Sequence, residues 1–177
     1  MKKISPLIRE LLEVILIAFL PFFIISQFIA RPFIVQGASM EPNFQNGNYL
    51  IIDIISYRFN DPERGDVVVF RYPGNRSLYY IKRIIGLPGD HISLRDGDVF
   101  VNGKITQEKY FSLDVDTLAF NRTDFSLVEN QFFVMGDNRA ASFDSRNWGP
   151  LKRDDIIGAA RFRIWPLLEF EFFRNSN

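Results

Sequence analysis

Twenty consecutive positions near the N-terminus, residues 11–30, contain a single ionisable residue, Glu13, close to the start of the stretch. At about 1.5 Å per residue, a helix of this length spans about 30 Å, which is the thickness of the hydrocarbon core of a bilayer. The stretch therefore predicts one transmembrane helix, and the remainder of the chain has to fold on one side of a membrane.

The charges that flank this stretch predict its orientation. Three basic residues precede it, partly offset by Glu10, and one follows it closely: Lys2, Lys3, Arg9 and Arg31. Because positive charge accumulates on the cytoplasmic side, we expect residues 1–10 to form a cytoplasmic tail. Residues 31–177 then form an extracytoplasmic domain.

A cleaved signal peptide is the alternative interpretation, since it also combines a basic start with an apolar stretch. Cleavage requires small residues at both the minus-one and the minus-three position. A cut after Ala30 leaves Phe28 at minus three, and a cut after Phe28 leaves a large residue at minus one. We therefore favour an uncleaved anchor over residues 11–30.

Composition narrows the chemistry of the extracytoplasmic part. The chain has no Cys and one His, which excludes disulfide scaffolds, thiolate zinc sites and cysteine nucleophiles, and leaves no ordinary multi-His metal site. Lys and Arg number 21, as do Asp and Glu, so no basic surface for nucleic acid is expected. Hydroxyl, carboxylate and Lys or Arg chemistry remain, with no cofactor and no metal.

The pattern after residue 31 is typical of strands. Short runs rich in Val, Ile, Phe and Tyr alternate with turn residues, at 49–55, 67–72, 78–85, 99–101, 131–135 and 159–165. Leu87-Pro88-Gly89-Asp90 suits a type II turn, and Asp96-Gly97 and Asn102-Gly103 are hairpin signals. The sequence predicts a mainly β, antiparallel domain, with residues 104–129 as an irregular insertion.

Ser39 is a candidate nucleophile because it lies in Gln36-Gly37-Ala38-Ser39-Met40-Glu41-Pro42, a Gly- and Pro-bounded segment that can expose a hydroxyl. Most loop serines only form local hydrogen bonds, and that interpretation stays open at this point. A serine nucleophile also needs a base. The single His91 follows Gly89-Asp90 and is expected to be a solvated turn residue.

Lys82 is the alternative base. A lysine accepts a proton only when neutral, and a pKa of about 10.4 prevents this near neutral pH unless burial penalises the ammonium. Strand alternation places Tyr80, Lys82 and Ile84 on one face, so Tyr80 and Ile84 would shield the amine from water. An ordinary charge on an edge strand remains the competing interpretation.

A third polar cluster follows the predicted strand at 131–135. It contains two acidic, two basic and two hydroxyl side chains that could form a hydrogen-bonded network: Asp137, Arg139, Ser142, Asp144, Ser145 and Arg146. The same network could be purely structural. Either way, the composition predicts a loop that is held in one conformation.

Together these segments resemble the bacterial type I signal peptidase (leader peptidase) family of membrane-anchored Ser/Lys endopeptidases. The resemblance covers most of the chain and rests on five ordered motifs: 37–42, 49–53, 64–70, 80–90, and 136–139 with the cluster that follows it. It implies a largely β catalytic domain. It also implies Ser39 as the nucleophile, Lys82 as the general base and Ser142 as a hydroxyl that orients the lysine, with Asp144 and Arg146 holding the site together.

Further roles are implied by the same resemblance. Gly37 stands where some members carry an oxyanion-hole Ser, so oxyanion stabilisation would rest on backbone N–H groups, notably that of Ser39. Ala140 and Ala141 replace a polar pair that is often found in the last motif. Pockets for small substrate residues would be lined by Val35, Met40, Phe44, Tyr80 and Ile81.

The resemblance predicts an enzyme that cleaves signal peptides from exported preproteins at the outer face of the plasma membrane, or alternatively of a thylakoid membrane. Its partners would be preproteins and the bilayer, and no oligomer is required. Two other functions stay open at this point. One is a catalytically silent, membrane-tethered β module that binds exported proteins, and the other is a Ser/Lys peptidase with a narrow list of membrane substrates.

Overall fold

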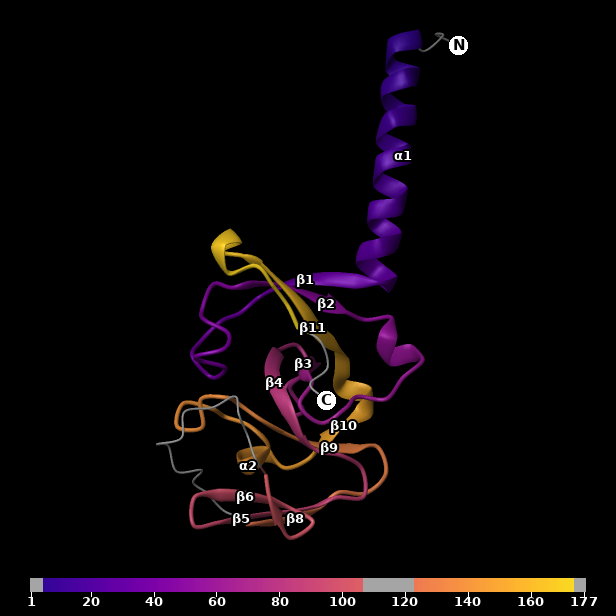
Figure 1. Ribbon diagram of the computed structural model, residues 1–177. Coiled ribbons are helices and arrows are strands. Elements are labelled where there is room, and N and C mark those ends of the chain that lie inside the picture. The colour runs from indigo at the N-terminus through magenta and orange to yellow at the C-terminus, as the bar shows by residue number, and fades with distance from the viewer. Residues whose placement is uncertain (1–4, 107–122, 174–177) are drawn as a thin grey trace.

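The computed structural model of the protein describes residues 5–106 and 123–173. The chain starts with helix α1 (Pro6–Phe28), which begins where the Ser5 hydroxyl accepts a hydrogen bond from the Ile8 N–H at 3.4 Å and Pro6 occupies the first turn. No α1 residue is buried, and the helix stands apart from the β strands (Figure 1). The anchor was expected at 11–30, but the chain leaves the helix after Phe28 and Ala30 already belongs to a strand.

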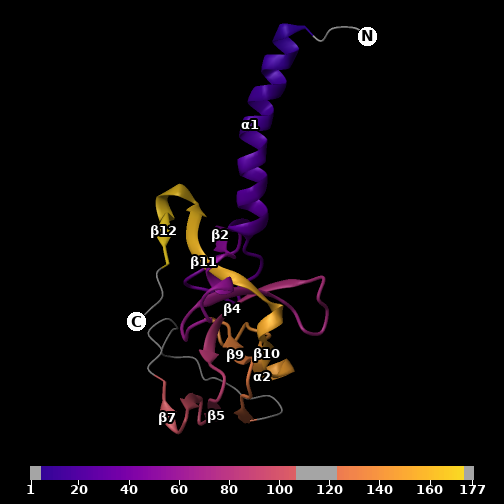
Figure 2. The same ribbon diagram turned by 90° about the vertical axis from the view of Figure 1, so that its right-hand side faces the viewer.

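In the described part of the chain, α1 is the one helix long and apolar enough to cross a membrane, with a mean hydropathy of 2.3. A helix that is apolar all round needs an apolar environment on every side. The β strands do not provide it, because Figure 2 shows α1 extending away from them from a second direction as well.

The β strands form two antiparallel sheets. The larger sheet has eight strands, β1 (Ala30–Ile34), β2 (Tyr49–Asp53), β3 (Val67–Arg71), β4 (Tyr79–Gly86), β9 (Gln131–Met135), β10 (Leu151–Lys152), β11 (Ile156–Trp165) and β12 (Glu171–Phe172). Its order is β1-β2-β11-β3-β4-β9-β10, with β12 paired to β11. The smaller sheet has the order β7-β6-β5-β8, from β5 (His91–Arg95), β6 (Asp98–Val101), β7 (Lys104–Ile105) and β8 (Asp124–Ser126).

Four short helices connect these strands: η1 (Ser56–Arg58), α2 (Ser145–Trp148), η2 (Arg153–Asp155) and η3 (Leu167–Glu169). The expected mainly antiparallel β architecture is confirmed.

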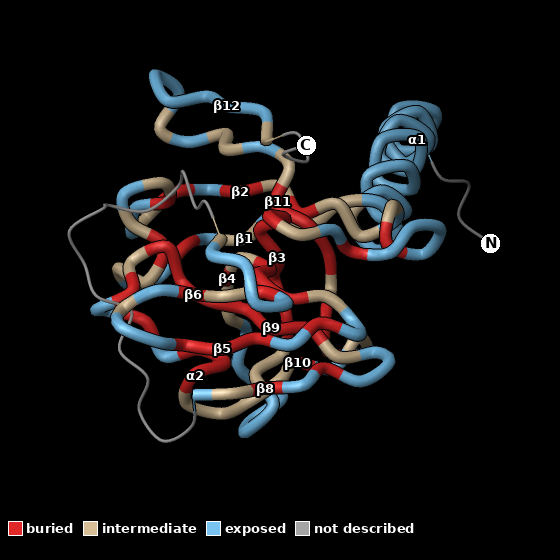
Figure 3. Tube along the Cα trace, turned by 60° about the horizontal axis from the view of Figure 1, so that its bottom comes forward, coloured by how far each residue is buried: buried red, intermediate tan, exposed pale blue. Residues whose placement is uncertain are grey.

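The two faces of the larger sheet bury different core clusters. Val68 and Phe70 of β3 belong to a cluster with Ile84, whereas Val67 and Val69 belong to a cluster with Leu50, as strand alternation requires. A third cluster joins the larger sheet to the smaller one through residues such as Ile85 and Phe133. Many of the buried residues lie on β3, β4, β9 and β11, which are neighbours in the larger sheet (Figure 3). β4, which carries Lys82, lies between β3 and β9 in the interior of the larger sheet.

The predicted turns are present. Gly89 has φ +87°, and the Asp90 N–H donates to the Leu87 carbonyl at 3.0 Å, as in a type II turn. Asp96 and Gly97 have φ of 51° and 85° and connect β5 to β6, whose pairing includes Arg95 opposite Asp98.

Three parts of the chain differ from the sequence expectations. β1 follows α1 almost directly, where the expected anchor still continued. β5 begins at His91, which was expected to be a solvated turn residue at the mouth of a strand. The range 104–129, expected to be irregular, contains the short strands β7 and β8, while its central residues 107–122 lie outside the described residues. These short strands pair with β6 and β5, so tertiary pairing outweighs their weak local pattern.

Candidate active site

Ser39 lies in the segment 36–47 between β1 and β2, which we call the nucleophile segment. Its two ends are joined, because the Val35 N–H donates to the Asn48 carbonyl and the Gly47 N–H donates to the Val35 carbonyl, both at 2.9 Å. The side chains of Met40 and Phe44 are buried and fix the segment to the core. Ser39 itself remains partly exposed, as a nucleophile must be.

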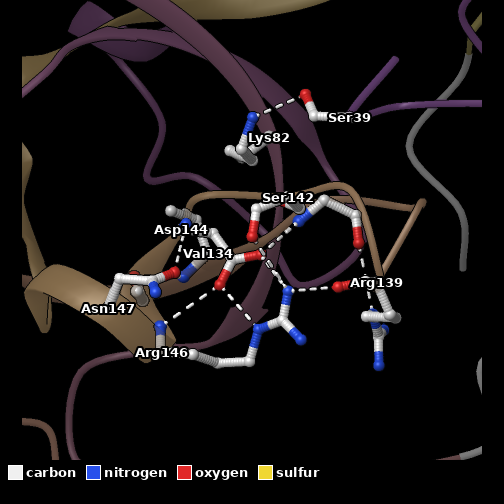
Figure 4. A network of polar contacts seen from close by, with 10 residues as sticks. Ser39, Lys82, Val134, Arg139, Ser142, Asp144, Arg146 and Asn147 are labelled. Atoms are coloured by element: carbon white, nitrogen blue, oxygen red, sulfur yellow. Dashed lines mark hydrogen bonds and ion pairs between the residues drawn. The ribbon is translucent and has the colours of Figure 1, made fainter. Parts of the chain in front are cut away.

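Lys82 reaches Ser39 from the middle of β4. Its Nζ donates to the Ser39 Oγ at 2.7 Å (Figure 4), and it also donates to the Ile81 carbonyl at 2.9 Å. The lysine is only 4% exposed, and the Tyr80 ring centroid lies 5.6 Å from Nζ. The chain thus brings together a partly exposed hydroxyl and a buried amine, as strand alternation predicted for Lys82.

Burial also sets the protonation of this amine. Desolvation lowers the pKa of Lys82 from its ordinary 10.5 to about 8, although the negative charges of Asp144 and Asp137 oppose that shift. The positive charge of Arg146 favours the neutral amine. A substantial fraction of the lysine is consequently neutral at mildly alkaline pH.

Gly136, directly after β9, lets the following loop approach Ser39. A side chain here would place a Cβ 2.3 Å from the Ser142 Oγ and 2.4 Å from the Ser39 carbonyl oxygen. The Asn138 N–H donates to the same carbonyl at 3.1 Å. The loop after β9 therefore contacts Ser39 directly through backbone atoms.

Asp144 and Arg146 form a buried bidentate ion pair, with Nε–Oδ1 and Nη2–Oδ2 distances of 2.8 Å (Figure 4). The same carboxylate accepts from the Gly136 N–H at 3.0 Å. Arg146 Nη2 donates to the Arg139 carbonyl at 2.8 Å and to the Ser142 carbonyl at 3.3 Å. One ion pair therefore fixes both ends of the loop that contacts Ser39.

A second ion pair connects β4 to the same loop. Arg83, next to Lys82, donates to both carboxylate oxygens of Asp137 at 2.8 and 2.7 Å. The side-chain amide of Asn43 donates to Asp137 Oδ2 at 2.8 Å. Asp137 thus joins the strand that carries the lysine, the loop after β9 and the nucleophile segment.

A cleft of about 530 Å³ opens beside the Ser39 and Lys82 side chains. It is lined by residues of β1, β2, β4, the nucleophile segment with the preceding Val35, and the loop after β9, including Phe33, Val35, Gly37, Leu50, Tyr80, Ile81, Ala141 and Phe143. Most of its lining is apolar, so the cleft suits an extended peptide with small apolar side chains.

Comparison with known proteins shows to which family the chain belongs. The model of the family described as "Signal peptidase, peptidase S26" matches residues 8–165. The chain belongs to this signal peptidase family. Membership makes it a hydrolase of the protease class.

Individual relatives agree with the family match. Signal peptidase IB of Staphylococcus aureus (strain MRSA252) is 35% identical over 93% of this chain and 94% of its own length. Probable signal peptidase I-2 of Synechocystis is 40% identical over 81% of this chain and 66% of its own length. A solved structure of a signal peptidase I from Enterococcus faecalis is 30% identical, covering 56% of this chain and 97% of that one, with a TM-score of 0.47.

Only some of the pocket residues that the signal peptidase resemblance implied line the cleft. Val35, Tyr80 and Ile81 line the cleft, whereas Met40 and Phe44 do not. Met40 is 0% and Phe44 1% exposed, and both lie in the core cluster that includes Val35. These two residues can influence the cleft only through the side chains that they support.

Ser142 is buried beside Gly136, but its hydroxyl makes no hydrogen bond within the described residues. Lys82 instead donates to Ser39 and Ile81. The expected orienting contact between Ser142 and Lys82 is therefore not formed here, and the Ser142 backbone contributes to the site by accepting from Arg146.

His91 lies in the smaller sheet and faces β8. Its Nδ1 is 3.2 Å from the Ser126 Oγ and its Nε2 is 3.4 Å from Asp124 Oδ1, and about half of its side chain is exposed. This agrees with the solvated position expected for it, although it belongs to a strand.

Sequence reasoning did not single out Asn43 or the close contact at Gly136. Gly136 was quoted only as part of a motif, and nothing local in the sequence shows what a glycine contacts. Asn43 meets Asp137 across 94 residues, so only the folded sheet reveals that contact.

Proposed function

We propose that this signal peptidase cleaves signal peptides from exported preproteins by a Ser39–Lys82 dyad. The observation that carries the proposal is the 2.7 Å contact between the buried Lys82 Nζ and the partly exposed Ser39 Oγ. A lysine whose pKa is lowered to about 8 can act as a general base, which an ordinary lysine cannot do near neutral pH.

The reaction starts with neutral Lys82, which takes the Ser39 proton while the Oγ attacks the carbonyl carbon of the scissile bond. The tetrahedral intermediate collapses as Lys82 returns the proton to the departing amine. The resulting acyl-enzyme reacts with a water whose proton passes to Lys82. Lys82 then returns this proton to the Ser39 Oγ as the bond between Oγ and the new carboxyl group breaks, which restores the hydroxyl and the neutral amine. Neither a metal nor a cofactor takes part in these steps.

The developing oxyanion requires a hydrogen-bond donor close to Ser39. The backbone N–H of Ser39 donates to no partner among the described residues, so it can serve as this donor. Gly37, at φ +89° and with no neighbour within 4 Å of a Cβ position, leaves room for the substrate carbonyl.

The ion pair of Asp144 with Arg146 stabilises the loop after β9, which borders the site. It holds the Gly136 N–H and the Ser142 carbonyl, and Gly136 in turn borders the Ser39 backbone. We assign Ser142, Asp144 and Arg146 positioning roles because, in this structure, they reach Ser39 and Lys82 through the loop and not by direct hydrogen bonds.

The substrate is expected to bind as an extended strand between the cleft-lining residues of β1 and β4. Main-chain hydrogen bonds would provide affinity, and shallow pockets formed by Val35, Tyr80 and Ile81 would select small residues at minus one and minus three.

We propose that α1 crosses the bilayer with residues 1–10 in the cytoplasm and the β domain outside, in the plasma membrane or alternatively a thylakoid membrane. No residue of α1 is buried. The tip between β11 and β12 lies at the same end of the molecule as α1 (Figures 1 and 2), and its Leu167 and Leu168 are 71% and 102% exposed. This placement holds the cleft close to membrane-bound substrates, which raises their effective concentration.

Cleavage of several purified preproteins by the detergent-solubilised enzyme, with the cut site identified by mass spectrometry, tests this function. We expect a single cut after a small-x-small sequence in each preprotein. Cleavage of one membrane protein only would favour the narrow-specificity peptidase, and binding without any cleavage would favour the silent β module.

A further inference from the structure

Arg163 lies on β11, opposite Leu50 of β2 on one side and Glu171 of β12 on the other. Irregularities in the β11–β2 register occur on both sides of it, between Ala160 and Phe162 and between Arg163 and Trp165. Such irregularities redirect side chains. The Arg163 side chain is only 12% exposed, although it comes from the strand that leads to the exposed tip.

One guanidinium connects two separate parts of the chain. Nη1 donates to the backbone carbonyl of Asn43 at 2.7 Å, while Nη2 donates to Glu171 Oε2 at 2.5 Å and Nε donates to the Glu169 carbonyl at 2.9 Å. The guanidinium carbon also lies 5.6 Å from the centre of the Phe173 ring. Arg163 therefore joins the nucleophile segment to the C-terminal hairpin, by which we mean residues 163–173.

Asn43 is held from two directions. Its carbonyl accepts from Arg163, and its side-chain amide donates to Asp137. The next residue, Phe44, packs its ring 4.7 Å from the Phe173 ring of the hairpin. Asn43 follows Ser39 by only four residues, so the position of Asn43 limits where the Ser39 backbone can lie.

A hollow of about 500 Å³ adjoins Asn43 and Arg163, and neither Ser39 nor Lys82 lines it. Arg163 is likewise absent from the lining of the cleft beside the dyad. A substrate in that cleft consequently does not contact Arg163, which excludes a direct part in binding or in proton transfer at that cleft.

We propose that Arg163 is a positioning residue for Ser39, which fixes the nucleophile segment by tying it to the C-terminal hairpin. This inference rests on the proposed function, because it assumes that Ser39 is the nucleophile. The physical basis is that a shift of about 1 Å at a nucleophile can cost about 100-fold in rate. The hydrogen bonds of Arg163 restrict such shifts of the nucleophile segment, although Arg163 does not approach the reacting atoms.

The test compares Arg163→Ala, Arg163→Lys and Arg161→Ala with the full-length wild type in detergent, on one preprotein. Arg161 is a matched control because it lies on the same strand, is similarly shielded and forms an ion pair with Asp53 of β2, 3.7 Å away. For each variant, kcat, KM, the pH midpoint of kcat/KM and the melting temperature are measured, and Ser39→Ala is assayed alongside.

For Arg163→Ala we expect kcat to fall about tenfold or more, with KM changed less than about threefold and the pH midpoint unchanged. Arg163→Lys should recover part of kcat, because an ammonium can still donate to the Asn43 carbonyl, and it provides the test if the alanine variant does not fold. Arg161→Ala should keep kcat within about twofold.

The proposal is overturned if Arg163→Ala keeps more than half of the wild-type kcat. It is also overturned if Arg163→Ala and Arg161→Ala both lose kcat in proportion to the decrease in their melting temperatures. A shifted pH midpoint would also overturn it, since it would mean that Arg163 acts on Lys82. Residual activity in Ser39→Ala would be a separate result, because it would contradict the proposed Ser39–Lys82 dyad itself.

Discussion

The Lys82 Nζ and the Ser39 Oγ lie 2.7 Å apart although the two residues are separated by 43 positions in the sequence. The contact joins a central strand to a loop that the core fixes through Met40 and Phe44. In the proposed dyad, this contact makes the protonation of the buried Lys82 amine the property that controls catalysis.

Activity should rise with pH through the pKa of Lys82. In the proposed dyad the base is the neutral amine, whose pKa is about 8, so kcat/KM should increase about tenfold per pH unit below 8 and level off above it. At pH 6 we expect about 1% of the plateau value. A pH profile of preprotein cleavage measures this, and a rate independent of pH between about 6 and 9 would contradict it.

Replacing Lys82 by Met should stabilise the fold while it abolishes cleavage. The folded-state pKa of Lys82 is below the ordinary 10.5, so the folded protein binds fewer protons than the unfolded chain between about pH 8 and 10.5. The cost of burying the ammonium is therefore complete below about pH 8 and disappears as the pH approaches 10.5. At pH 7, urea unfolding should show a gain of roughly 1–3 kcal/mol.

The exposed Lys152 provides the control for that measurement. Lys152→Met should change the free energy of unfolding by less than about 0.5 kcal/mol at the same pH. Equal effects at both positions would show that Lys82 bears no burial penalty.

Gly136→Ala should damage the active site more than the fold. Its Cβ would lie 2.4 Å from the Ser39 carbonyl oxygen, so the nucleophile segment or the loop after β9 has to move. Gly86→Ala is the matched control, because its Cβ would lie 2.7 Å from Ile92 and Leu127 in the core. Both should lose about 1–3 kcal/mol of stability, with kcat reduced by about tenfold or more only for Gly136→Ala. Equal kcat in the two folded variants would contradict this account.

Arg146→Ala should strongly destabilise the protein, because it leaves the carboxylate of Asp144 buried without its charge partner. Removing one partner of such a pair costs about 3–5 kcal/mol. Arg95→Ala is a suitable comparison, since Arg95 and Asp124 are 65% and 48% exposed and 3.8 Å apart. That variant should lose less than about 1 kcal/mol in urea unfolding. Similar losses of unfolding free energy for both variants would show that the buried ion pair stabilises the fold no more than the exposed pair does.

Local sequence patterns predicted the features that depend on local chemistry. Alternation along β4 places Lys82 beside Tyr80, as the contact between Nζ and the Tyr80 ring shows. The turn at Leu87-Pro88-Gly89-Asp90 followed from the φ freedom of glycine and the fixed φ of proline. The mainly antiparallel β fold followed from the short β-rich runs and these turns.

The rest depends on sheet order, which no local pattern reveals. β11 lies between β2 and β3 in the larger sheet, and this strand order brings Arg163 to Asn43, which is 120 residues away in the sequence. β1 begins at Ala30, the last residue of the expected anchor, and no local pattern shows that the helix already ends at Phe28. The burial of Met40 and Phe44 likewise depends on which face of the sheet the nucleophile segment covers.

The most direct test of the dyad is the rate of preprotein cleavage by wild type, Ser39→Ala, Lys82→Ala and Lys82→Arg, with folding of each variant verified by its melting temperature. The account predicts that all three folded variants lose cleavage by at least about 100-fold, including Lys82→Arg, because a guanidinium stays protonated and cannot accept the Ser39 proton. Substantial cleavage by folded Ser39→Ala or Lys82→Arg would contradict it.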